Sequence, residues 1–129
     1  MKITTKTDYA VIVLTHLAMS PDRPVSLQSI AEAAGISEAY LQRIAARLKA
    51  KKIIKPKHGA FGGYLLNKPA AKITLKMVID SVGDQTAAVR CSEEGCPHSA
   101  NCSARTGWEC FQMELNELFE TTTIADMIS

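Results

Sequence analysis

The sequence predicts a mainly α-helical fold with a small β-hairpin wing: a winged helix-turn-helix head followed by a long C-terminal dimerisation helix. Three observations support this prediction. A helix–glycine turn–helix pattern runs from Ser26 to Ala50, two β-prone runs around a glycine cluster follow it directly, and a heptad-like apolar seam lies near the C-terminus. A hairpin directly after a helix-turn-helix is a wing. We therefore expect a winged DNA-binding head at residues 1–83, a cysteine-bearing loop at 84–102, and a dimerisation helix with a C-terminal cap at 103–129.

The first two helices are marked by apolar stripes and end signals. Residues 7–19 are mostly apolar and predict a buried helix, which Pro21 and Pro24 end. Its expected inward stripe includes Val11, Leu14, Leu17 and Ala18. Ser26 and Gly35 are typical of the N-cap and C-cap of a short second helix.

The third helix is the expected reading helix. Ser37 is its predicted N-cap, and its inward residues recur at spacings of three and four: Leu41, Ile44 and Leu48. The opposite face then carries Gln42 and Arg43, flanked by Ser37 and Tyr40. Glutamine suits adenine and arginine suits guanine, so these two side chains are the predicted base readers.

The wing follows at once. Two β-prone runs, Ile53–Lys57 and Tyr64–Leu66, flank a glycine-rich turn that begins after His58. The glycines do not stand in the strand–GxGxxG–helix order of a dinucleotide site, so nucleotide binding is not expected. Lys55, Lys57 and His58 are the wing side chains expected to contact DNA.

The charge is divided along the chain. Residues 1–76 contain 13 Lys and Arg against 4 Asp and Glu, whereas residues 77–129 contain 2 against 9. A solvated helix face is the simpler explanation of such a basic run, but its place in a helix-turn-helix favours a polyanion-binding head. The predicted DNA-binding residues are Ser37, Tyr40, Gln42, Arg43, Arg47, Lys55, Lys57 and His58.

A fourth helix is expected after Thr74, its N-cap, and ends at Gly83. Its expected buried face is Leu75, Val78, Ile79 and Val82. The following 19 residues, from Asp84 to Cys102, show no periodicity. A structureless stretch of that length in a small domain calls for a reason.

The cysteines are that reason. Cys91, Cys96 and Cys102 form a Cys-x4-Cys-x5-Cys pattern within twelve residues, and Cys110 follows in the last long helix. Thiolates select zinc, copper(I) or iron–sulfur clusters. Zinc is the second choice, because structural zinc sites use paired short spacings. Four unrelated free thiols remain the alternative, and no cysteine–histidine pairing indicates an enzyme.

The last long helix carries an apolar seam with Trp108, Phe111, Leu115 and Leu118, which Phe119 is expected to widen. Its other face is acidic. We expect the seam to pair two subunits, because winged heads read twofold-related half-sites as dimers; packing on its own domain is the alternative. Thr123–Asp126 has the pattern of a capping box for a final short helix.

The order of these parts resembles the IscR/NsrR family of bacterial iron–sulfur transcription regulators. The resemblance covers nearly the whole chain and rests on five pieces in order: Thr7–Ala10, the wing Gly59–Leu66, the cysteine trio, Trp108, and Thr123–Met127. It implies a homodimeric repressor in which an iron–sulfur cluster lies between the loop of one subunit and the head of the other. The expected ligands are Cys91, Cys96, Cys102 and, from the partner subunit's first helix, the residue corresponding to Asp8.

The sequence resembles two branches of this family, and both remain possible. The cysteine spacing and Asp8 look like the nitric-oxide-sensing NsrR branch, and residues 102–108 look like regulators of iron–sulfur assembly operons. Arg105 stands where IscR-type members place a histidine ligand, and arginine stays protonated, so a 4Fe–4S cluster is favoured over 2Fe–2S. Cys110 and His98 are the other candidate fourth ligands, and a capping role in the first helix is the metal-free alternative for Asp8.

Compartment and function follow from these expectations. No apolar run long enough to cross a membrane and no signal peptide is visible, so a reducing cytoplasm is expected, where four cysteines favour metal binding over disulfides. The expected partners are double-stranded DNA and a second copy of the chain. The leading hypothesis is a cluster-dependent repressor of iron–sulfur assembly genes. The alternatives are a nitric-oxide-sensing repressor, a cofactor-free cysteine redox or interaction protein, and a zinc-stabilised DNA binder.

Overall fold

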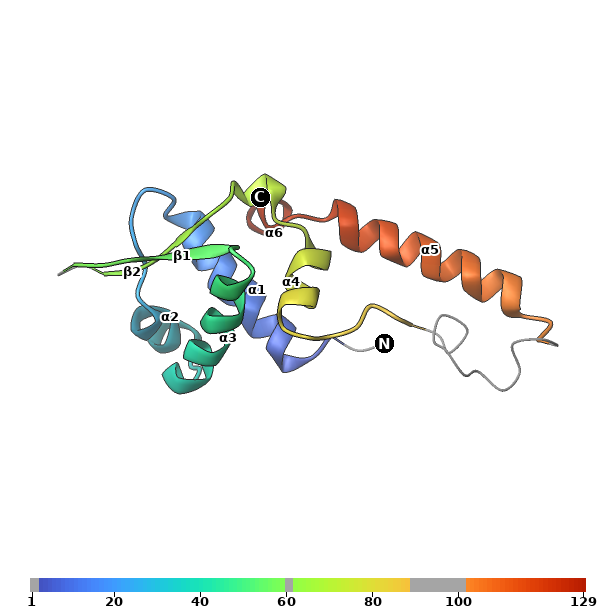
Figure 1. Cartoon of the computed structure of the whole chain (residues 1–129), viewed down its shortest axis with the longest axis horizontal. Helices are drawn as coiled ribbons and strands as arrows, with labels where there is room; N and C mark the ends of the chain where they lie inside the picture. The colour runs from blue at the N-terminus through green and yellow to red at the C-terminus, as the bar shows by residue number, and fades with distance from the viewer. Residues whose placement is uncertain (1–2, 60–61, 89–101) are drawn as a thin grey trace.

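The structure, a computed structural model, describes residues 3–59, 62–88 and 102–129 (Figure 1). It is mainly helical with one two-stranded antiparallel hairpin, which confirms the predicted fold class. A head built from the first helices and the hairpin carries one long helix that extends away from it (Figure 1). The elements in order are α1 Thr5–Met19, α2 Leu27–Ala34, α3 Glu38–Ala50, β1 Ile54–Lys57, β2 Gly63–Leu66, η1 Ala70–Lys72, α4 Leu75–Ser81, α5 Arg105–Thr121 and α6 Ile124–Ile128.

The head is packed around α1. This helix contacts α2, α3, α4, β2 and α6, and its buried residues are Thr7, Ala10, Val13, Leu14 and Leu17. The prediction placed Val11 and Ala18 in the inward stripe, but both are only half-buried. The difference has a simple cause. Other elements surround α1 on several sides, so apolar residues on every side of the helix make contacts. A helix that is apolar all round has no single stripe from which its most buried face could be predicted.

The predicted caps at Ser26, Gly35 and Ser37 are confirmed, whereas α4 ends at Ser81 with Val82 as its C-cap, before the predicted Gly83. The Ser29 amide donates to Ser26 Oγ (3.1 Å), the Tyr40 amide donates to Ser37 Oγ (3.4 Å), and Gly35 closes α2 with a φ of 69°. However, the N-cap of α1 is Thr4, and the Asp8 amide donates to its carbonyl (3.0 Å). The capping alternative for Asp8 is therefore wrong, since Asp8 lies inside the helix.

The hairpin is anchored at its base. Its register pairs Ile54 with Leu66 and Lys57 with Gly63. Val25, just before α2, adds a third strand-like partner by exchanging two backbone hydrogen bonds with Tyr64 (3.0 and 2.9 Å). A Cβ at Gly63 would lie 2.5 Å from the Val25 carbonyl, so only glycine allows this close approach.

The C-terminus returns to the head. Thr123 and Asp126 form the predicted capping box of α6, and the Ile124 amide donates to the Ile73 carbonyl (2.9 Å). Ile124 is fully buried, and α6 packs on α1 and η1. The C-terminal end of α5 is thus tied to the head, and α5 also packs on α4.

α4 begins as predicted, with the Met77 amide donating to Thr74 Oγ1 (3.2 Å). Val78, Ile79 and Val82 are buried as expected, whereas Leu75 is only half-buried. Gly83, with a φ of 77°, ends this part of the chain in the left-handed conformation that favours glycine.

The chain then enters the cysteine stretch through residues 84–88, which we call the entry segment. Its first residue, Asp84, lies against the first turn of α1, with a side chain that is 10% exposed. Thr4 Oγ1 and Thr7 Oγ1 both donate to Asp84 Oδ2, and Lys6 Nζ lies 3.4 Å from Oδ1. Burial raises the pKa of this carboxyl, but the hydrogen bonds from Thr4, Thr7 and Lys6 outweigh it and hold the pKa below its ordinary value.

The other end of the entry segment is held by α5. Gln112 is 6% exposed, and its Oε1 accepts from the Ala88 amide (2.6 Å). Its Nε2 donates to the Thr86 carbonyl (2.9 Å) and to Asn116 Oδ1 (2.8 Å). The entry segment is therefore fixed between α1 and α5.

Asp84→Asn tests the contribution of the buried charge. Because hydrogen bonds to a charged group contribute more than neutral ones, the substitution should lower the free energy of unfolding at pH 7 by about 1–3 kcal/mol. A lowered folded-state pKa gives stability that is present above the ordinary aspartate pKa, about 3.9, and is lost as the pH falls through the folded value. The difference between wild type and variant should therefore shrink below about pH 4.

Asp80→Asn is the matched control, because Asp80 is an exposed carboxylate on α4 paired with Lys76 at 2.9 Å. It should cost less than about 0.5 kcal/mol. Urea unfolding from pH 3 to pH 7 measures both variants. A wild-type-to-Asp84→Asn difference that stays constant over this range would contradict the assignment.

Candidate functional site

The outward face of α3 is the candidate reading surface. Leu41, Ile44 and Leu48 are at most 2% exposed, whereas Gln42 and Arg43 are exposed on the opposite side. The structure thus gives the third helix the orientation that the spacing predicted. A helix whose inner face is buried and apolar, and whose outer face carries exposed Gln and Arg, can present both side chains to base edges in a major groove.

Two of the predicted DNA-binding residues on α3, Tyr40 and Arg47, make contacts with other parts of the chain. The Tyr40 ring is half-buried and packs edge-on against Tyr9 of α1, with ring centroids 5.3 Å apart. Arg47 Nη1 donates to the Val82 carbonyl at the end of α4 (2.7 Å). Both residues therefore also hold α3 against its neighbours, a role that the sequence did not suggest.

The wing is fixed to α3 by the turn between them. Lys52 adopts a left-handed φ of 60°, and its carbonyl accepts from Asn67 Nδ2 (2.9 Å). The Ile53 amide donates to the Leu48 carbonyl (3.0 Å). Lys55, Lys57 and His58 are exposed along this hairpin, while positions 60 and 61 at its tip lie outside the described residues.

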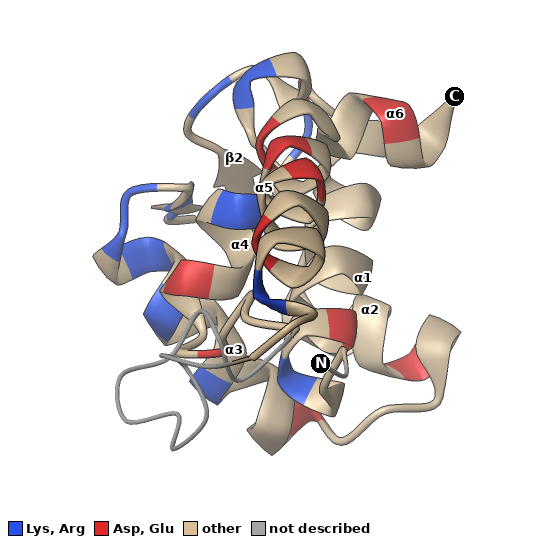
Figure 2. Cartoon of the chain, turned by 90° about the vertical axis from the view of Figure 1, so that its right-hand side faces the viewer, with Lys and Arg blue, Asp and Glu red and all other residues tan. Residues whose placement is uncertain are grey.

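The charge division survives folding. Figure 2 shows acidic segments repeating along α5, whereas basic segments are concentrated in the head. The exposed acidic residues of α5 are Glu109, Glu114, Glu117 and Glu120. Nucleic acid would be attracted to the head and repelled by most of the surface of α5.

The predicted metal ligands are only partly within the described residues. Asp8 is an exposed carboxylate in the first turn of α1, and Cys102 is half-buried just before α5. Cys91, Cys96 and His98 lie outside the described residues. Among residues 3–59, 62–88 and 102–129, no three His, Cys, Asp or Glu side chains converge as a metal site. The donor set of three thiols and one carboxylate fits an iron–sulfur cluster by its chemistry, since thiolates are the standard cluster ligands.

Cys110 lies in the second turn of α5 and is exposed. Arg105, at the start of α5, pairs with Glu109 at 2.8 Å.

The apolar face of α5 is exposed. Trp108 and Phe111 are 45% and 48% exposed and pack edge to face, and Leu118 is 59% exposed, whereas Leu115 of the predicted seam is half-buried. Phe119, predicted to widen this face, is instead 5% exposed. The correction follows from helix geometry: Phe119 lies seven residues after Gln112, on the side of α5 that is buried in its own chain.

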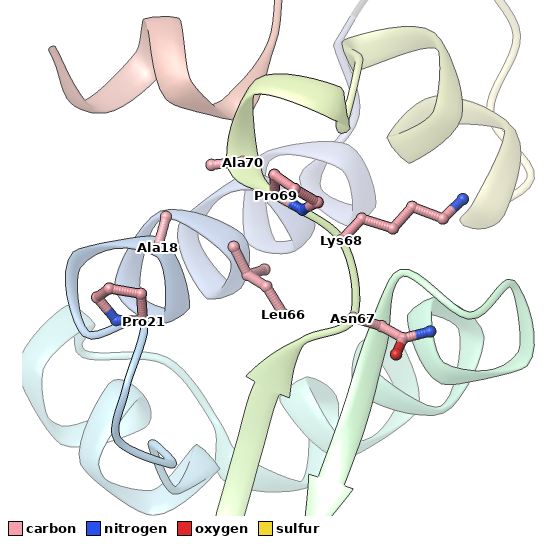
Figure 3. Close-up of a pocket in the computed structure, with 7 residues that line it drawn as sticks. All are labelled: Ala18, Pro21, Leu66, Asn67, Lys68, Pro69 and Ala70. Atoms are coloured by element: carbon pink, nitrogen blue, oxygen red, sulfur yellow. The ribbon is translucent and has the colours of Figure 1, made fainter.

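A surface hollow near the end of α1 offers no chemistry. It lies between α1 and the turn after β2 (Figure 3), and its titratable lining residue, Lys68, directs its ammonium away from the hollow. The remaining lining residues are Ala18, Pro21, Leu66, Asn67, Pro69 and Ala70. In the part of the chain that the structure describes, no helix is both long and apolar enough to cross a membrane.

Sequence reasoning missed Asp84 and Gln112. Gln112 had a usable signal, because it shares a helix face with the apolar Phe119, and a polar residue on a buried face needs partners. Asp84 had no such sequence signal, because the residues that donate hydrogen bonds to it lie some eighty positions earlier in the chain.

Comparison with known proteins places these features in a family. The family model Rrf2, described as an iron-dependent transcriptional regulator, matches residues 3–129. The HTH-type transcriptional regulator IscR of Yersinia enterocolitica is 34% identical over 131 residues, covering 100% of this chain and 80% of the relative.

Solved structures agree with this match. CymR (YrzC), the global cysteine regulator of B. subtilis, superposes with a TM-score of 0.83 at 28% identity, covering 99% of this chain and 96% of that one. T. potens IscR superposes with a TM-score of 0.77 at 31% identity, covering 99% and 86%. The chain belongs to the Rrf2 family and is a transcriptional regulator rather than an enzyme.

Proposed function

We propose that the protein is a homodimeric repressor whose affinity for its operator depends on an iron–sulfur cluster, and that it controls iron–sulfur assembly genes from the cytoplasm. The observation that carries the DNA-binding part is the outer face of α3, where Gln42 and Arg43 are exposed opposite a dry inner face. The cluster part is supported by the cysteine trio and by the iron dependence in the family's description.

The proposed reading mode combines two elements. α3 enters the major groove, where Gln42 and Arg43 contact base edges, and Ser37 and Tyr40 lie beside them. Lys55, Lys57 and His58 of the hairpin, together with the remaining guanidinium donors of Arg47, contact the backbone. Base contacts specify the sequence, whereas phosphate contacts set affinity and its dependence on salt.

The proposed cluster ligands are Cys91, Cys96 and Cys102 of one subunit and, from the partner, the residue corresponding to Asp8. When bound, the cluster supplies a centre that iron shortage, oxidants or nitric oxide remove or modify. The chain's own part is to hold the thiolates, to offer a carboxylate from an exposed helix turn, and to position the entry segment. We favour a 4Fe–4S cluster, because Arg105 cannot replace a histidine ligand.

One observation favours a second candidate. The chain is similar to CymR, described as the global cysteine regulator of B. subtilis, and to S. aureus CymR, whose structure was solved in an oxidized form. The second candidate is therefore a cofactor-free regulator in which the cysteines of this chain act as redox thiols. A nitric-oxide-sensing repressor shares the cluster with the leading proposal and differs only in its signal. Protein purified without oxygen should be brown under either cluster proposal and colourless under the cofactor-free one.

Arg43→Ala should cost about 1–3 kcal/mol of operator binding and relax the preference at one base pair, because a base contact is lost. Lys57→Ala is the matched control for a backbone contact. It should weaken all sequences alike and reduce the slope of log affinity against log salt by about 1. Binding titrations on operator variants at several salt concentrations measure both effects. An unchanged base preference in Arg43→Ala would show that α3 reads DNA in another register.

The cluster assignment is tested on single variants. Cys91→Ala, Cys96→Ala and Cys102→Ala should each lose the cluster, because two thiolates hold iron poorly. Asp8→Ala should assemble a less complete or faster-decaying cluster while the apo fold survives, since a hard oxygen donor is the weakest ligand of a soft centre. Cys110→Ala is the control and should load fully. Anaerobic iron and sulfide counts decide the matter, and a stable cluster in Asp8→Ala with loss in Cys110→Ala would make Cys110 the fourth ligand.

The proposed dimer uses the exposed face of α5. Replacing Phe111 and Leu118 with Glu should give monomers, because two carboxylates would face their twofold copies across a buried seam. Both positions are about half exposed or more within the chain, so the monomer should fold normally. Met113→Glu is the matched control: Met113 is 70% exposed on the opposite side of α5 and should stay dimeric. Sedimentation measures both variants beside the wild type, and a double variant that remains dimeric would exclude this face.

A further inference from the structure

Asp84 is an unusual residue to bury at a chain junction. Both of its carboxylate oxygens are engaged, and all three partners come from the start of α1: Thr4, Lys6 and Thr7. The side chain is 10% exposed, and its charge is stabilised only where these partners surround it, so the contact favours one arrangement of the parts that it joins. The contact therefore defines where the entry segment sits on α1.

The same turn of α1 leads to the reading helix. Thr7, one of the three donors, is 3% exposed, and two residues later Tyr9 packs edge-on against Tyr40. Tyr40 lies in the first turn of α3, two residues before Gln42. A shift of the first turn of α1 would therefore change the packing that sets the start of α3.

A second tie joins the same junction to the other half of α3. Arg47 Nη1 donates to the Val82 carbonyl (2.7 Å), two residues before Asp84. Gln112 holds Thr86 and Ala88 at the far end of the entry segment, three residues before Cys91. The stretch that leads into the cysteines is thus bound to α1, α3 and α5 within a few residues.

We propose that Asp84 is the positioning residue that couples the cysteine segment to DNA reading. It holds the first turn of α1 in the place that orients α3, and a change in the cysteine segment acts on α3 by loosening this contact. The inference rests on the proposed cluster-dependent function and adds the residue through which the signal passes.

The test compares operator affinity of cluster-loaded and metal-stripped protein, for wild type and Asp84→Asn, with iron and sulfide counted on each sample. Coupling between sites is typically 5-fold or more in affinity. Asp84→Asn should load its cluster and yet bring the loaded-to-stripped ratio close to one. Asp80→Asn is the matched carboxylate control on α4 and should keep the wild-type ratio, and Asp84→Glu, which retains a carboxylate, should restore part of it.

Two less disruptive substitutions test the same contact if the Asp84→Asn variant folds poorly. Thr4→Val removes one donor to Asp84 and should reduce the ratio, while Thr5→Val, at the exposed neighbouring position, should not. If Asp84→Asn and Thr4→Val weaken the loaded and stripped forms by the same factor, the contact is merely structural and the inference is overturned.

A double-mutant cycle separates failure of this inference from failure of the proposed function. A wild-type ratio of one would refute cluster dependence itself. Operator binding of cluster-loaded protein carrying Asp84→Asn, Tyr9→Leu or both tests the link, because the Asp84 contact is intact in that form and coupled residues give non-additive effects. Non-additivity supports the route from Asp84 to α3. Additive effects of Asp84→Asn and Tyr9→Leu would overturn this route. Asp80→Asn combined with Tyr9→Leu is the control pair, whose effects should add.

Discussion

The position of α1 is the constraint on which the rest of the structure depends. Five other elements pack against this helix, and Ala10, Val13 and Leu14 are completely buried in it. Because protein interiors are close-packed, α1 cannot shift without repacking its neighbours. Its first turn is also the part that touches the entry segment through Asp84 and carries the exposed Asp8. The helix therefore links the reading head to the part of the chain that leads into the cysteines.

In the proposed dimer, α5 would extend this constraint to a second subunit. The helix is tied to the head at its C-terminal end, where the Leu75 amide donates to the Thr122 carbonyl (2.9 Å) and the buried Ile124 follows. Gln112 ties its middle to the entry segment. A pair of subunits joined along the exposed face of α5 would hold the two heads at a defined separation, which is what twofold-related half-sites require. The acidic remainder of α5 would stay away from DNA.

The elements that could be predicted are those whose causes lie close together in the chain. The caps at Ser26, Ser37 and Thr74, the capping box after α5 and the outward face of α3 each depend on residues within a few positions, so local chemistry was sufficient. The errors have the opposite origin. The inward face of α1 and the burial of Phe119 depend on which elements pack against them. The bonds of Asp84, Gln112 and Arg47 join distant parts of the chain, and no local pattern announces them.

Hydrogen–deuterium exchange on the wild-type protein, with and without the proposed iron–sulfur cluster, tests the central claim most directly. Exchange reports local opening, and the first turn of α1 has a backbone amide, that of Asp8, whose bond to the Thr4 carbonyl is part of the junction. Stripping the cluster should speed exchange in the first turns of α1 and α3 as well as in the cysteine stretch, while the buried middle of α1, around Val13 and Leu14, stays protected. Faster exchange confined to the cysteine stretch, with both first turns unchanged, would contradict the account.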